Sequence, residues 1–132
     1  MNTTLLIINL ILLAILLVMG ANQLYLYLMG KKSATLLSEE EFREGMRRAQ
    51  VIDVREKDVF VAGHILGARS IPYTTFKATH ASLRKDMPIY LYDHKQTLAI
   101  RAAIILRKNG FTDVYILKPG YKQWTGKIKS GN

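Results

Sequence analysis

The chain has 132 residues, enough for one small domain, with 19 lysines and arginines against 10 aspartates and glutamates, a net charge of +9. It contains no cysteine, which excludes disulfides, thiolate metal ligands and a cysteine nucleophile within this chain. Its basic residues are scattered among acidic ones rather than interleaved with aromatic ones, so nucleic-acid binding is not expected.

An uncharged, apolar segment occupies residues 5–28. As a helix it would be about 36 Å long, enough to cross a hydrocarbon core about 30 Å thick. Basic residues tend to stay on the cytoplasmic side, and here Lys31 and Lys32 follow the segment while none precedes it. A cleaved signal peptide is the alternative, but neither a basic n-region nor a small-residue cleavage site is evident. We expect an uncleaved single-pass anchor at residues 1–30 in the plasma membrane, with the remainder in the cytoplasm.

All charged residues follow residue 30, so the excess positive charge belongs to the part of the chain beyond the anchor. Beside an anionic inner leaflet, contact with lipid headgroups is the expected use of this charge. Residues 31–37 are interpreted as a short polar linker and 38–126 as the folded domain. Residues 127–132 are interpreted as a C-terminal tail.

Three short apolar runs, at 51–54, 88–92 and 114–117, are continuous rather than alternating, which is typical of strands buried on both faces. A further short strand is expected at 68–71. Helix-competent sequence separates the runs, and this order predicts an α/β domain with a mainly parallel sheet.

Two helices carry clear end signals. Ser38 and Glu41 have capping-box spacing, which predicts that a helix opens the domain. Residues 98–109 form the clearest helical pattern, and Gly110 stands where a left-handed residue ends a helix.

A candidate site follows the run at 88–92. Ligands of open parallel sheets bind beyond the carboxyl ends of strands, and Asp53 and Asp93 stand at or near two such ends. The segment 93–98 enters a helix whose first N–H groups lack intrahelical partners and whose dipole favours an anion. We therefore predict an anion cradle here, made of Asp93, His94, Lys95, Gln96, Thr97 and Leu98.

Several short motifs follow one another along residues 35–126. They are Asp53-Val54-Arg55, Gly63-His64-Ile65, Ile71-Pro72, the strand, loop and helix at 88–109, Gly110-Phe111, and Gly120-Tyr121 with Trp124. Together they resemble the rhodanese-like family of sulfurtransferase domains. The resemblance implies a mainly parallel five-stranded sheet flanked by helices, with one active-site loop after the strand at 88–92.

In that family the loop begins with the nucleophilic cysteine that carries a persulfide, and it commonly ends with arginine. The matching positions here are Asp93 and Leu98. A carboxylate cannot form the persulfide on which sulfur transfer depends. The chain is therefore expected to be inactive as a sulfurtransferase and to act as a binding or regulatory module, with no cofactor and no metal.

Asp93 allows three interpretations. Its carboxylate occupies the N–H cradle of the loop in place of an anionic persulfide. Alternatively, it faces outward with His94 and Lys95 as a surface for a protein partner, and these two interpretations can coexist. In the third, Asp93 acts with Asp53 as a nucleophile or metal ligand in phosphoryl chemistry. A relay of sulfur through a partner's cysteine is a further alternative.

The other candidates are interpreted as structural. The resemblance implies that Asp53 holds loops and caps backbone N–H groups, and Arg55 is expected to pair with an acid near the base of the loop. His64 is expected to be partly buried and bonded to backbone rather than to a metal. Arg101 and Lys95 are expected to belong to a solvated basic face.

Overall fold

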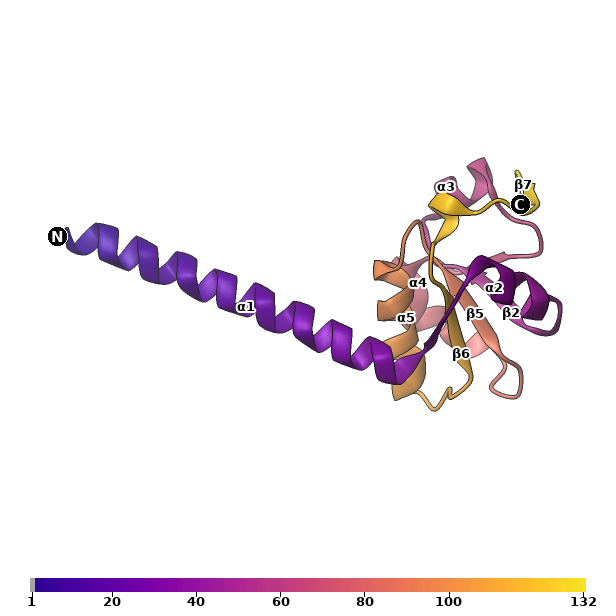
Figure 1. Cartoon of the computed structure of the whole chain (residues 1–132), viewed down its shortest axis with the longest axis horizontal. Coiled ribbons are helices and arrows are strands. Elements are labelled where there is room, and N and C mark those ends of the chain that lie inside the picture. The colour runs from indigo at the N-terminus through magenta and orange to yellow at the C-terminus, as the bar shows by residue number, and fades with distance from the viewer. Residues whose placement is uncertain (1) are drawn as a thin grey trace.

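A 31-residue helix, α1 (Thr3–Ser33), extends away from the rest of the molecule in the computed structural model, which describes residues 2–132 (Figure 1). The side chain of Asn2 caps it by accepting a hydrogen bond from the N–H of Thr4. Large apolar side chains from Leu5 to Met19 are exposed along it. Within residues 2–132 it is the one helix long and apolar enough to cross a membrane.

The domain is built on a five-stranded sheet in which every neighbouring pair is parallel. In spatial order the strands are β1 (Thr35–Leu37), β6 (Val114–Leu117), β5 (Ile89–Tyr92), β2 (Gln50–Asp53) and β4 (Arg69–Ser70). The continuous apolar runs therefore form the centre of the sheet, and the predicted α/β fold with a parallel sheet is confirmed. Asp53 lies level with Tyr92 across the β2–β5 pair, so the two central strands end side by side.

Helices cover both faces of the sheet. They are α2 (Glu39–Gly45), α3 (Lys57–Ala62), α4 (Tyr73–Thr79) and α5 (Thr97–Lys108), with short 3-10 turns η1 (Met46–Arg48), η2 (His80–Ser82) and η3 (Tyr121–Gln123). One core cluster joins Phe76 of α4 and the alanines of α5 to the sheet, and a second joins Phe42 of α2 to the other face. The predicted capping box of Ser38 and Glu41 is present.

The segment expected to be a linker, residues 31–37, is regular structure. The helix α1 continues to Ser33, whose Oγ donates to the carbonyl of Met29, and β1 follows after one residue. The physical reason is that β1 pairs with β6 and places Leu37 in the second core cluster. The helix α1 is thus joined to the sheet without a flexible spacer.

The C-terminal segment also differs from the expected tail. Within residues 127–132, β7 (Ile128–Lys129) pairs antiparallel with β3 (His64–Ile65). The N–H of Gly131 donates to the carbonyl of Val61 at 2.8 Å, which extends the attachment. Backbone groups that an unpaired loop would leave to water find partners here, which is why these residues are ordered against the domain.

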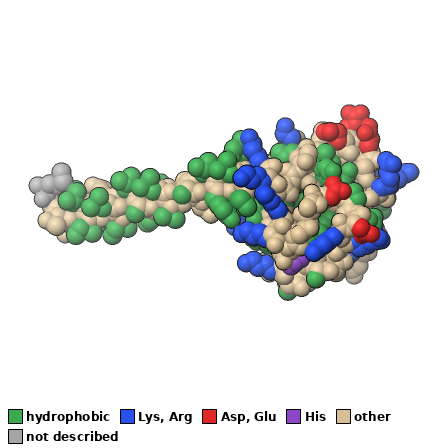
Figure 2. Space-filling view, turned by 90° about the horizontal axis from the view of Figure 1, so that it is seen from below, with side chains coloured by type: hydrophobic (Ala, Val, Ile, Leu, Met, Phe, Trp, Pro, Cys, Tyr) green, Lys and Arg blue, Asp and Glu red, His purple; other side chains and the backbone are tan. Residues whose placement is uncertain are grey.

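The last turns of α1 pack on α5. Gly30 approaches Ile100 so closely that a Cβ at residue 30 would lie 2.8 Å from its Cγ2 atom. Farther along, the Lys108 ammonium donates to the hydroxyl of Tyr25 at 3.3 Å. Figure 2 shows basic side chains gathered where α1 meets the domain, with acidic ones farther from α1 on that face. The loop that precedes α5 therefore lies close to α1.

Candidate functional site

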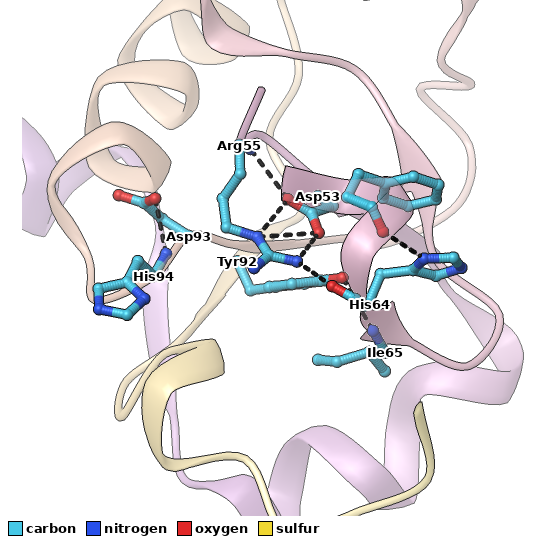
Figure 3. A network of polar contacts seen from close by, with 9 residues as sticks. Asp53, Arg55, His64, Ile65, Tyr92, Asp93 and His94 are labelled. Carbon is cyan, nitrogen blue, oxygen red and sulfur yellow. Dashed lines mark hydrogen bonds and ion pairs between the residues drawn. The ribbon is translucent and has the colours of Figure 1, made fainter. Parts of the chain in front are cut away.

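Asp93 begins the loop between β5 and α5, and its carboxylate turns back into that loop. The side chain is buried, with an exposed fraction of 7%. Its Oδ1 accepts from the N–H of His94 at 2.6 Å, and its Oδ2 accepts from the N–H of Leu98 at 2.9 Å (Figure 3 draws the first). Because Gln96, the residue before α5, makes no side-chain cap, Asp93 supplies the acceptor for the first turn. A negative charge there also suits the helix dipole.

The segment at residues 118–122 holds the loop in place through hydrogen bonds. The carbonyl of Asp93 accepts from the N–H of Tyr121 at 2.9 Å, and that of His94 accepts from the N–H of Lys122 at 3.1 Å. The Gln96 side-chain amide donates to the carbonyl of Lys118 at 2.7 Å. These bonds involve the loop backbone and Gln96, so they hold the loop independently of the Asp93 carboxylate.

Gly120 makes this close approach possible. Its φ is +74°, and a Cβ there would lie 2.4 Å from the His94 carbonyl oxygen and 2.6 Å from that of Lys95. A left-handed φ and a contact this short both require glycine. The glycine of the Gly120-Tyr121 motif thus serves to seat one loop against the other.

The other loop side chains divide between solvent and core. His94, Lys95 and Thr97 are exposed, whereas Gln96 is half-buried. Leu98, where related proteins place arginine, is half-buried and packs against the first core cluster. The loop therefore offers a fixed backbone with two adjacent polar side chains facing outward.

Asp53 and Arg55 form a buried ion pair beside the loop (Figure 3). Arg55 donates from Nε to both carboxylate oxygens and from Nη2 to Oδ2 at 2.6 Å, and its N–H donates to Oδ1. Burial opposes the charge of Arg55, but these hydrogen bonds and the charge of Asp53 raise its pKa. Since Arg55 binds both oxygens of Asp53, the contacts support a structural role for the pair and weigh against Asp53 as a nucleophile or metal ligand.

Arg55 also ties together segments that are distant in sequence. Its Nη2 donates to the carbonyl of Gly63 at 2.8 Å. Its guanidinium lies 4.1 Å from the ring centroid of Tyr121, the residue whose N–H braces Asp93. Through these contacts the end of β2, the Gly63-His64 segment and the brace behind the loop are held in one arrangement.

His64 is a buried histidine bonded within the fold. Its Nδ1 lies 2.8 Å from the carbonyl of Phe60, and its ring stacks on that of Phe60 at a centroid distance of 3.7 Å (Figure 3). Only 2% of the residue is exposed. These contacts support the structural interpretation of His64.

Tyr92 is a site residue that sequence reasoning missed, because it lies inside an apolar run and carries no motif of its own. It is fully buried, and its hydroxyl accepts from the N–H of Ile65 at 3.1 Å. Burial, and secondarily the negative charge of Asp53, raise the pKa of Tyr92. Tyr92 therefore links β5 to β3 from directly beneath the loop.

The fold is a parallel α/β sheet with an ordered loop at the end of the central strand β5. Comparison with known protein families identifies which family has this fold. A family model for the rhodanese-like domain matches residues 38–127. The chain belongs to the rhodanese-like domain family.

Two bacterial relatives match most of this chain in sequence. The chain is 50% identical to the uncharacterised protein YqhL of Bacillus subtilis over 104 residues, covering 79% of this chain and 82% of YqhL. It is 31% identical to the thiosulfate sulfurtransferase GlpE of Pseudomonas fluorescens over 88 residues, covering 64% of this chain and 81% of GlpE.

Solved structures agree on the fold. A rhodanese-like domain protein from Staphylococcus aureus superposes with a TM-score of 0.67 at 20% identity, covering 74% of this chain and 99% of that one. A rhodanese-related protein from Thermoplasma volcanium gives a TM-score of 0.67 at 17% identity, covering 72% and 97%. At these identities the likeness establishes the architecture of the sheet and its helices.

Proposed function

We propose that this protein is a membrane-anchored rhodanese-like domain that does not transfer sulfur and that binds a protein partner through the loop at residues 93–98. The observation that carries the proposal is the Asp93 carboxylate bonded to the N–H groups of His94 and Leu98. It puts a hydrogen-bonded carboxylate where a sulfurtransferase would carry its anionic persulfide. With no cysteine in the chain, no side chain can accept the sulfur.

The same geometry supports a binding role for the outer side of the loop. The loop keeps its shape through backbone bonds to Tyr121 and Lys122, while His94 and Lys95 stay exposed. A surface that is already ordered loses little conformational entropy when a partner binds. Fold and chemistry are separable, so a rhodanese-like loop without its nucleophile is available for recognition.

The position of the loop beside α1 supports a partner that binds close to the membrane. We propose that α1 crosses the plasma membrane, with the domain in the cytoplasm beyond Lys31 and Lys32. A pocket of about 180 Å³ is lined by Thr97 of the loop and by Leu26 and Tyr27 of α1. The loop would then lie near the bilayer surface, which favours a partner that is itself at the membrane.

Two measurements test the proposal. The full-length protein in detergent is expected to form no thiocyanate from thiosulfate and cyanide, and thiocyanate production would contradict inactivity. For binding, the native protein and a His94→Ala, Lys95→Ala variant are purified by affinity from solubilised membranes and compared by mass spectrometry.

The matched control is Lys85→Ala, which removes one exposed positive charge outside the loop. A protein recovered with the native chain and with the control, but lost with the loop variant, would support recognition by the loop. If all three chains recover the same proteins, the loop is not the interface.

A further inference from the structure

A basic pocket lies where the anchor helix meets the domain. Its volume is about 230 Å³, and its walls come from α1, α4 and α5. The polar residues that line it are Asn22, Tyr25, Tyr73, Lys77, Arg101 and Lys108. It is separate from the Asp93 carboxylate and from the buried Asp53–Arg55 pair, neither of which lines it.

The positive charges of this pocket are not neutralised by the protein. The sequences of α1, α4 and α5 contain no aspartate or glutamate. Within residues 2–132, the ion pairs join Arg55 to Asp53 and Arg84 to Asp86, so Lys77, Arg101 and Lys108 take part in none. A cluster of three cations without a counter-charge indicates a site for an anion.

Arg101 gives the more specific indication. Its Nε is buried, and among the described residues it is one of two buried side-chain polar atoms without a hydrogen-bond partner. An unsatisfied buried donor costs free energy, and an unsatisfied charged donor costs more. The Nη groups of Arg101, which lines the pocket, make no hydrogen bond or ion pair among the described residues, and an oxyanion in the pocket would accept from them because guanidinium groups match phosphate oxygens in geometry and charge.

The wall supplied by α1 indicates which anion this is. Tyr25 follows Leu5 by 20 residues, about 30 Å along a helix, which equals the thickness of a hydrocarbon core. If α1 spans the membrane as proposed above, Asn22 and Tyr25 lie at headgroup level. The pocket also includes Leu26, an apolar side chain from the same helix, which suits contact with the apolar part of a lipid.

We propose that this pocket binds the phosphate of an anionic glycerophospholipid from the cytoplasmic leaflet. Arg101 donates to the phosphate from the floor of the pocket, and Lys77 and Lys108 neutralise it from the rim. The inference rests on the proposed membrane anchoring and extends it, because a bound headgroup would link α1, α4 and α5 and fix the orientation of the domain on the bilayer. The loop at residues 93–98 would then be presented to its partner at a defined height.

The test uses the full-length protein in detergent micelles with equal amounts of phosphatidylglycerol and phosphatidylcholine of matched acyl chains. Native mass spectrometry reads the lipid that stays bound. The variant is Lys77→Gln with Lys108→Gln; both side chains are exposed, and urea unfolding of the variant checks that the domain stays folded, since Lys108 also donates to Tyr25. The control, Lys85→Gln with Lys127→Gln, removes the same charge outside the pocket.

The native protein and the control are expected to retain phosphatidylglycerol over phosphatidylcholine by roughly tenfold or more, and the pocket variant is expected to lose most of this preference. Arg101→Gln is expected to act in the same direction. Equal preference in pocket variant and control would overturn the proposal, since it would mean that the general positive charge attracts the lipid.

Two further arms separate the sources of phosphate and the two proposals. Loss of bound phosphatidylglycerol to an equal concentration of glycerol 3-phosphate would overturn the lipid assignment in favour of a soluble phosphate ester, whereas retention supports the lipid. Alkaline carbonate washing of membranes reports the anchor separately. If the wash releases the protein and it still prefers phosphatidylglycerol, only the proposal that α1 spans the membrane is contradicted. If the protein stays in the membrane but shows no such preference, only the proposal of a lipid-binding pocket is contradicted.

Discussion

The Asp93 carboxylate accepts a hydrogen bond from the N–H of Leu98 at 2.9 Å, so the first residue of the loop holds the last. These are the positions that match the cysteine and the common arginine of the resemblance described above. The acid caps the first turn of α5, and Leu98 packs its side chain against the core. The hydrogen bonds of Asp93 and the packing of Leu98 therefore stabilise one and the same loop.

Replacing Asp93 by alanine should destabilise the domain. The change removes acceptors for the N–H groups of His94 and Leu98, and loss of such a cap costs about 1–2 kcal/mol. Urea unfolding of the full-length protein in detergent, followed by fluorescence of Trp124, the one tryptophan, reports the domain without interference from α1. His94→Ala is the control and should change the free energy of unfolding by less than about 0.5 kcal/mol. Equal stability of both variants would show that the carboxylate is not a brace.

Gly120→Ala should disturb the loop more than its backbone angle alone explains. A Cβ at residue 120 meets the carbonyl oxygens of His94 and Lys95, in addition to the strain of a positive φ. Gly67→Ala is the matched control, because its φ is +95° and no atom lies within 4 Å of the added Cβ. We expect Gly67→Ala to cost about 1 kcal/mol and Gly120→Ala at least about 2 kcal/mol more. Equal losses would mean that the brace moves aside freely.

Removing Arg55 should be the most damaging of these single changes. Arg55→Met leaves the fully buried Asp53 without its partner, and an uncompensated buried charge costs about 3–5 kcal/mol. The control is Arg84→Met, which breaks the exposed pair with Asp86 and should leave the unfolding midpoint nearly unchanged. Similar midpoints for both variants in urea would argue against a structural role for the Asp53–Arg55 pair.

The buried Tyr92 should make the domain sensitive to high pH. Burial raises the pKa of Tyr92 above that of the unfolded chain, which is about 10, so above that pH the unfolded state loses a proton that the folded state keeps. The free energy of unfolding should therefore fall as pH rises beyond about 10. Tyr92→Phe should reduce this slope by about 1.4 kcal/mol per pH unit, the value for one proton. Identical slopes above pH 10 in both proteins would contradict the assignment.

Much of the sheet could be predicted because its central strands are continuous apolar runs. The run at 114–117 has the same bounds as β6, and the run at 51–54 is shifted by one residue relative to β2, which is 50–53. The short edge strand β4 lies within the run expected at 68–71, whereas β1 and β7 were not predicted, because two or three residues are too few to show a period. Their pairing depends on neighbours far along the chain.

The candidate site was located by sequence, but its geometry was not. Spacing placed Asp93 at a strand end, yet spacing does not fix where a side chain points, so three interpretations stayed open. Arg101 shows the same limit in a different way. It was expected on a solvated face, but its Nε is buried, and Arg101 lines a pocket together with residues of α1 and α4. The sequence pattern alone gave no reason to expect that these three helices meet there.

The loop should still be able to support sulfur transfer once it is given a nucleophile. Its backbone bonds to Tyr121 and Lys122 do not involve the Asp93 side chain, so Asp93→Cys with Leu98→Arg should place a thiolate at the head of a preformed cradle. Backbone N–H groups and the N-terminus of α5 would lower the pKa of that thiol, and the arginine would attract thiosulfate.

The measurement is thiocyanate formation from thiosulfate and cyanide by the full-length variant in detergent. The control is His94→Cys, which puts a thiol on the exposed side of the same loop. The double variant should exceed this control by at least about tenfold, because an activated thiolate in a positioned site outperforms a solvated thiol. The urea midpoint of the double variant shows whether it is folded. If this midpoint equals that of the native protein but the activity does not exceed that of His94→Cys, the loop backbone does not form the cradle. The protein would then lack the loop geometry for sulfur transfer as well as the cysteine at residue 93.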